Sequence, residues 1–157
     1  MQHYRTCMTR TIRFVDITTG YYRDLPPSAP TASARSLVQA IASADGSPLA
    51  LPYPGDHAIT ATISGHCLWG ALLTDGATVA RFGIALRSRC GSRLWSQMHA
   101  GQAYTAPLVE PWAALSPERT APPWAADFCM ALATAWQAVR REKNMKKSLT
   151  SPASVLY

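Results

Sequence analysis

The segment AITATISGHCLWGALLTDGATVARFGIALRS, Ala58–Ser88, is the strongest fold signal in the chain, because two apolar runs flank a single Asp-Gly pair. A two-residue hairpin turn of the favoured type needs a positive φ at both central residues, which Asp75 and Gly76 tolerate. The segment therefore predicts an antiparallel hairpin over about residues 58–87. With this loop, Trp69 is expected opposite Phe82, and Cys67 opposite Ile84.

This register assigns the hairpin residues to two faces, since successive side chains of a strand point to opposite sides. Trp69, Cys67, Phe82 and Ile84 share an apolar face that we expect to pack against helices. The opposite face is more mixed, and we expect it to be partly open. It pairs Leu72 with Val79, Gly70 with Arg81, Leu68 with Gly83, His66 with Ala85 and Ser64 with Arg87.

Upstream of the hairpin, the β-branched and aromatic residues of Thr11–Thr18 predict a first strand. A helix is expected after Pro30, with Thr31 or Ser33 as its N-cap. Its apolar stripe is Leu37, Val38 and Ile41, and Gly46 suits its C-terminal cap. The proline-rich segment SPLALPYPGD, residues 47–56, is expected to be a connector without regular structure.

Downstream, a helix is expected from about Arg89 to Ala100, and YTAPLVEPW, residues 104–112, is expected to contain a short edge strand. The clearest helix is opened by Pro122 and Pro123, and Asp127 suits its positive N-terminal end. Its apolar stripe is Trp124, Phe128, Leu132, Ala135, Trp136 and Val139.

These elements predict the α+β class: an antiparallel sheet built on the central hairpin and packed by two or three helices. Their order is compatible with a split β-α-β arrangement carrying an extra C-terminal helix. We expect one domain over residues 1–142, with residues 1–10 outside the ordered part, and a basic flexible tail over residues 143–157. Met8 is an alternative start, because the fold signal begins near Thr11.

The composition is that of a globular protein: the chain has 157 residues, of which 48% are hydrophobic and 15% charged. No stretch approaches the roughly 18 apolar residues of a membrane span, and the N-terminus lacks the apolar run of a secretory signal. We expect a cytoplasmic protein.

The net charge of +6 is concentrated near the C-terminus. Residues 1–139 contain ten basic and eight acidic residues, whereas the segment from Arg140 contains five basic residues and one acidic residue. All the lysines of the chain lie in that segment, so the body is nearly neutral.

Neither a metal nor a cofactor is expected. Cys7, Cys67, Cys90 and Cys129 are scattered and form no Cys-x-x-Cys pair, so we expect four thiols in a reducing compartment. His66 and Cys67 are adjacent, but in a strand they point to opposite faces and do not share a metal ion.

A thiol-dependent enzyme using Cys90 is one alternative. This residue lies in the first turn of the expected helix, where the helix dipole, Arg87, Arg89 and Arg93 favour a thiolate, and His66 is the candidate base. The competing interpretation is a small buried hydrophobe. The chain has no Gly-rich phosphate loop, no metalloprotease motif and no nucleophile elbow, which favours a non-enzymatic protein.

Nucleic-acid binding is a second alternative. It would use arginines near the hairpin, namely Arg81, Arg87, Arg89 and Arg93, together with the C-terminal residues Arg140, Arg141, Lys143, Lys146 and Lys147. Such side chains could follow a phosphate backbone. The competing interpretation is a solvated arginine rim beside a flexible tail.

Trp112 and Trp124 each follow a proline at the border of an expected loop. Tryptophan and arginine dominate binding hot spots, so both residues are candidates for a protein-binding surface. The competing interpretation is that each closes one end of the core.

The segments HCLWG and FGIALRSRCGSRLW, the MH pair, the PW pair at residues 111–112 and ADF at residues 126–128 resemble small uncharacterised proteins carried on bacterial plasmids and phages. The resemblance implies a mobile-element accessory protein. Small proteins of this class often act by binding and blocking a larger machine. From it we expect a non-enzymatic inhibitor of a host or rival-element protein, acting in fertility inhibition, conjugation or host defence.

Overall fold

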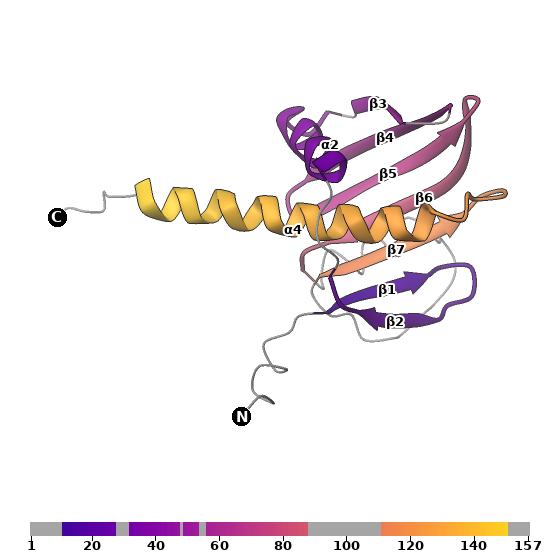
Figure 1. Ribbon diagram of the computed structural model, residues 1–157, viewed down its shortest axis with the longest axis horizontal. Helices are drawn as coiled ribbons and strands as arrows, with labels where there is room; N and C mark the ends of the chain where they lie inside the picture. Colours follow the sequence, from indigo (N-terminus) through magenta and orange to yellow (C-terminus); the bar gives the residue numbers. More distant parts are fainter. Residues whose placement is uncertain (1–10, 28–31, 48, 54–55, 88–110, 151–157) are drawn as a thin grey trace.

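The computed structural model describes residues 11–27, 32–47, 49–53, 56–87 and 111–150, with side chains as far as Asn144. These residues form one seven-stranded sheet, ordered β2-β1-β7-β6-β5-β4-β3, with two helices, α2 and α4, on one face (Figure 1). The predicted α+β class is confirmed, and the sheet is larger than the hairpin-based sheet that the sequence predicts.

Along the chain, two strands are followed by a helix, five further strands and a second helix. Their bounds are β1 Ile12–Asp16, β2 Tyr22–Leu25, α2 Ala32–Ser43, β3 Leu49–Tyr53, β4 His57–Ser64, β5 Cys67–Thr74, β6 Ala77–Ala85, β7 Trp112–Pro117 and α4 Ala125–Thr150. Neither helix, over its described residues, has the length and apolar character needed to cross a bilayer.

The predicted Asp-Gly turn joins β5 to β6. Asp75 and Gly76 have φ angles of 52° and 78°, as a type I′ turn requires. A second turn, at Gly65 and His66, was not predicted: it ends β4 and starts β5, so the long first strand of the expected hairpin is in fact two strands. Gly65 has a φ of 62°, which suits the first position of a type II′ turn.

The predicted register is wrong beyond the first two pairs, because β6 contains a β-bulge. Thr74 pairs with Ala77 and Leu73 with Thr78, but Leu72 pairs with Ala80, which leaves Val79 as the extra residue. The backbone N–H of Glu118 donates to the Val79 carbonyl over 3.0 Å, so the bulged peptide has a partner outside the hairpin. A one-residue shift exchanges the two faces.

The exchange moves Trp69 and Cys67 away from the helices. Trp69 pairs with Gly83, and Cys67 with Ala85, on the sheet face opposite α2 and α4. Leu68 and Leu72, expected on the mixed face, instead contribute to the helix-facing core with Phe82 and Ile84.

Two further expectations about the strands are wrong. The proline-rich connector contains β3, which pairs along the edge of β4. The edge strand expected within residues 104–112 lies almost entirely outside the described residues, and β7, which begins at Trp112 and lies between β1 and β6, was not predicted. Strands β1 and β7 are parallel and direct neighbours, so the arrangement is not a split β-α-β unit.

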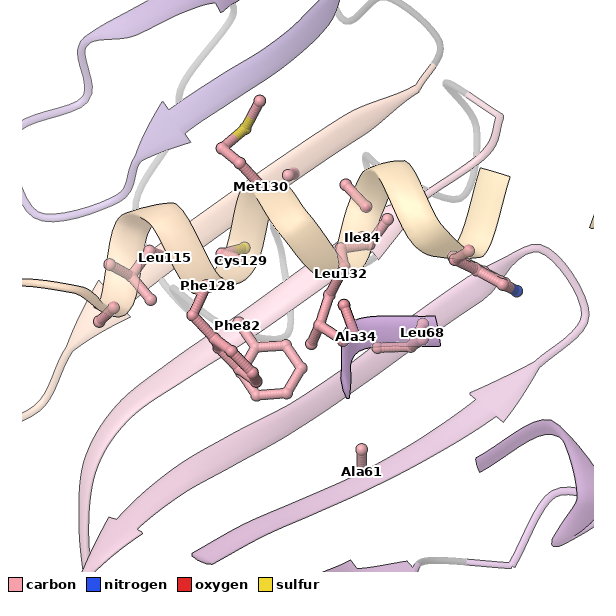
Figure 2. Close-up of a cluster of buried hydrophobic side chains, with 14 of the residues drawn as sticks. Ala34, Ala61, Leu68, Phe82, Ile84, Leu115, Phe128, Cys129, Met130 and Leu132 are labelled. Carbon is pink, nitrogen blue, oxygen red and sulfur yellow. The ribbon is translucent and has the colours of Figure 1, made fainter. Parts of the chain in front are cut away.

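The main core lies between the sheet and the two helices. In Figure 2, Phe128, Cys129 and Leu132 project from α4 toward the strands, and the rings of Phe128 and Phe82 meet edge to face with centroids 5.7 Å apart. Leu132 and Trp136 are almost completely buried, which confirms the predicted stripe of α4. In α2 the buried residues are Ala34, Val38 and Ile41.

Helix α4 continues into residues 143–157, which were expected to form a flexible tail, and ends at Thr150 (Figure 1). Its C-terminal part projects past the edge of the sheet in this view. On the side of α2, Arg35 Nη2 donates to both carboxylate oxygens of Glu142 over 2.7 and 2.8 Å. Glu142 is the single acidic residue from Arg140 to the C-terminus, and its carboxylate is thus paired with an arginine of α2.

Candidate anion-binding site

The candidate site lies at the end of the sheet toward which α4 runs. The β4–β5 turn, the end of β6 and the start of β7 meet there, because Cys67 pairs with Ala85 and Ala85 with Trp112. A pocket of about 390 Å³ opens between these strand ends and α4. We call it the basic pocket.

Two groups of residues line the basic pocket. The strand ends contribute His66, Leu86, Arg87 and Pro111. Helix α4 contributes Gln137, Arg140, Arg141 and Asn144, whose spacing of three, four and seven residues places them on one helix face.

The turn that carries His66 is held against β6, since the Leu86 N–H donates to the His66 carbonyl over 2.9 Å. The His66 ring in turn contacts α4: Arg140 Nη2 lies 2.9 Å from Nδ1. A guanidinium only donates, so Nδ1 accepts and the ring proton of a neutral His66 lies on Nε2. The turn therefore fixes the position of the Arg140 guanidinium at the pocket.

The charged side chains in the described lining of the basic pocket are all positive. Its described lining includes three guanidinium groups and no carboxylate. Within the described part of the chain, neither Arg87 nor Arg141 forms an ion pair, and both side chains are exposed. Glu142, the nearest acid along α4, is paired with Arg35 of α2 instead.

The other arginine that the sequence singled out on the hairpin is not part of this site. Arg81 lies in the middle of β6 and forms an ion pair with Glu118, with Nε 2.7 Å from Oε1. Because its charge is already matched by a carboxylate, Arg81 adds little to a surface for anions. Arg89, Arg93 and Cys90 lie outside the described residues.

The prediction that Trp112 belongs to a binding surface is wrong. Its side chain is fully buried on the sheet face opposite the helices, in a cluster with Val15, Ile17, Ala85 and Ala114. Its Nε1 is buried and has no hydrogen-bond partner among the described residues. The proline before it marks the start of a central strand rather than a loop border.

Trp124, the second tryptophan candidate, is half-buried at the N-terminal end of α4. Its ring stacks on Tyr53 with centroids 5.3 Å apart and meets His57 edge to face at 5.1 Å. The ring of His57 is also held by Thr74, with Nδ1 2.9 Å from Oγ1. These contacts connect β3, β4 and α4, so Trp124 closes the core at the end opposite the basic pocket.

The structure therefore brings together Arg87, Arg140, Arg141 and His66 from the residues considered in the sequence. Gln137, Asn144 and Pro111 were not predicted. The signal for the two amides was the polar spacing 137, 140, 141 and 144 at the end of an otherwise apolar helix. Among the described residues, no three His, Cys, Asp or Glu side chains gather as a metal site would require.

In comparisons with known proteins, the chain matches no protein-family model, no curated protein and no solved structure.

Proposed function

We propose that this protein is a non-enzymatic nucleic-acid-binding protein that holds the phosphate backbone at the end of the molecule formed by the basic pocket and the C-terminal part of α4. The observation that carries the proposal is the convergence of Arg87, Arg140 and Arg141 on one pocket whose described lining contains no carboxylate. Guanidinium groups bind phosphate oxygens in pairs of hydrogen bonds, which makes arginine the residue of choice for such contacts.

The position of the pocket supports a ligand longer than a single anion. Helix α4 runs on from the pocket to Thr150, and its sequence adds Lys143, Lys146 and Lys147. Helix positions 140, 143 and 147 share one face by their spacing. A phosphate backbone that enters the pocket can therefore continue along the projecting helix.

The predicted protein-binding role now has less support than it had in the sequence. Of its candidate residues, Trp112 is buried and Arg81 is paired with Glu118, and Trp124 is accounted for by its packing. An inhibitory role in a mobile element stays a prediction, as does its protein partner. A nucleic-acid ligand agrees with the cytoplasmic location that the sequence favours.

The proposal is tested by fluorescence anisotropy with a labelled mixed-sequence duplex of about 20 base pairs at about 50 mM salt, where phosphate contacts are strong. The wild type is expected to bind, and Arg140→Gln combined with Arg141→Gln is expected to weaken binding at least tenfold. The matched control, Arg23→Gln combined with Arg119→Gln, removes the same charge at exposed positions outside the pocket and is expected to bind like the wild type.

Absence of binding at this salt concentration would overturn the proposal. Equal weakening by the two double variants would also overturn it, because the effect would then follow the net charge and not the site. If a pull-down instead recovered one stoichiometric protein that contacts Arg140 and Arg141, the inhibitor prediction would replace it.

A further inference from the structure

We propose that the basic pocket binds a terminal phosphate, that is, a phosphomonoester at the end of a nucleic-acid strand, in preference to an internal phosphodiester. This inference rests on the proposed function and adds the chemical group that the site takes. It is carried by three features of the pocket: its charge, its volume and the arrangement of its donors.

The charge of the pocket exceeds what an internal phosphate needs. A phosphodiester carries one negative charge, whereas a phosphomonoester carries about −1.5 to −2 near neutral pH. Three guanidinium groups from two separate parts of the fold line the pocket: Arg87 follows β6, and Arg140 and Arg141 lie on α4. No carboxylate of the described lining offsets them, so a dianion matches the site better than a monoanion.

The donors of the pocket also suit a terminal group. A phosphomonoester presents three non-bridging oxygens, one more than an internal phosphate. Arg140 is held by His66 Nδ1 over 2.9 Å, so one of its nitrogens is already engaged and the rest of its fork has a defined direction. Each guanidinium has five N–H donors, so Arg140 keeps donors for a ligand.

The volume leaves room for the nucleoside that carries the phosphate. Binding sites for small molecules typically have about 300–1,000 Å³, and the basic pocket has about 390 Å³. The lining combines the amides of Gln137 and Asn144 with the apolar side chains of Leu86 and Pro111. Such walls can hydrogen-bond a sugar or base edge and cover an apolar ring face.

The test compares two single-stranded oligonucleotides of the same sequence, one with a 5′-phosphate and one with a 5′-hydroxyl, each carrying its fluorescent label at the 3′ end. The wild type is expected to bind the phosphorylated strand roughly tenfold more tightly, since hydrogen bonds to charged groups exceed neutral ones in strength. In Arg140→Gln combined with Arg141→Gln, the two affinities are expected to converge. The control Arg23→Gln combined with Arg119→Gln is expected to keep the difference.

The outcomes separate the two proposals. Equal affinity of the wild type for the two strands overturns the terminal-phosphate inference and leaves the proposed function standing. Failure to bind either strand overturns the terminal-phosphate inference, and failure to bind the duplex as well overturns both. Competition with a free nucleoside 5′-monophosphate separates the two sources of the phosphomonoester: displacement at micromolar concentration would assign the pocket to free nucleotides and overturn the assignment to strand ends.

Discussion

Gly70 shows how closely β4 and β5 approach each other. A Cβ atom built at this position would overlap the carbonyl oxygen of Thr60 and lie 2.9 Å from the Cα of Ala61. Both neighbours are backbone atoms of the paired strand, so a side-chain rotation does not relieve the overlap. The position therefore requires glycine for steric reasons.

We predict that Gly70→Ala lowers the free energy of unfolding by about 3 kcal/mol, at the upper end of the usual cost of overpacking. Denaturant unfolding followed by circular dichroism measures this. Gly46→Ala is the comparison, since its Cβ meets nothing within 4 Å and only the φ of +88° is unfavourable. That variant is expected to lose about 1 kcal/mol, and equal losses in both would contradict the steric explanation.

Cys129 is a second residue whose chemistry follows from its position. It belongs to α4 and is fully buried between this helix and the sheet, where its thiol donates to the Ala114 carbonyl over 3.5 Å. Burial raises the pKa of this thiol to about 12, because the thiolate loses its hydration.

Alkylation measures this protection. At about pH 8, where an exposed thiol ionises in part, Cys129 is expected to react with iodoacetamide orders of magnitude more slowly in the native protein than in the denatured chain. Mass spectrometry of the peptides gives both rates. Similar rates in the two states would show that Cys129 is not enclosed.

Among the elements, β2 pairs with β1 along four residue pairs, but three of its four residues are exposed, so an ion pair adds to its attachment. Arg13 Nε and Nη2 donate to the two carboxylate oxygens of Asp24 over 2.8 and 2.9 Å, and the Arg13 guanidinium lies 4.0 Å from the Tyr22 ring centroid. The hydrogen bonds from Arg13 hold the pKa of Asp24 below its ordinary value.

The lowered pKa of Asp24 determines how its contribution to stability changes with pH. A carboxylate whose pKa is lower in the folded state stabilises the fold above its unfolded pKa of about 3.9, and the contribution is lost as the pH falls through the folded value. We predict that Asp24→Asn destabilises the protein at neutral pH and that the difference from the wild type shrinks as the pH falls below the unfolded pKa and through the lower folded pKa of Asp24. Thermal unfolding across this pH range tests it.

Glu118→Gln is the matched control for that experiment. It breaks the Arg81–Glu118 pair, in which both side chains are well exposed, and such pairs contribute only about 0–1 kcal/mol. An Asp24→Asn curve that stays parallel to the wild type down to acid pH would contradict the assigned role of the Arg13–Asp24 pair.

The elements also show how far the sequence predicts this fold. Local signals were sufficient for β1, α2, the Asp75-Gly76 turn and α4, because periodicity and capping residues act within a few positions. The bulge at Val79 was not predictable, since its carbonyl is satisfied by the N–H of Glu118, far along the chain. Strands β3 and β7 contain or border prolines, and only their pairing partners make them strands.

At the scale of the whole molecule, the charge separates into a nearly neutral body and one basic end. The sequence predicts this asymmetry and the residues Arg140 and Arg141. It groups Arg87 with them as a candidate nucleic-acid surface. It does not predict that His66 contacts Arg140 or that these residues line one pocket, because that depends on the unpredicted Gly65-His66 turn and on the direction of α4 across the sheet. The order and direction of the strands and of α4 therefore bring the residues of the candidate site together, whereas their positive charge can be predicted from the sequence.

The central claim is that Arg140 and Arg141 bind nucleic-acid phosphates, and the salt dependence of duplex binding tests it most directly. Each phosphate contact contributes about −0.9 to the slope of log K against log salt concentration. Arg140→Gln combined with Arg141→Gln is expected to make the slope shallower by about 1.8, while Arg23→Gln combined with Arg119→Gln keeps the wild-type slope. A wild-type slope in the first double variant would contradict the claim.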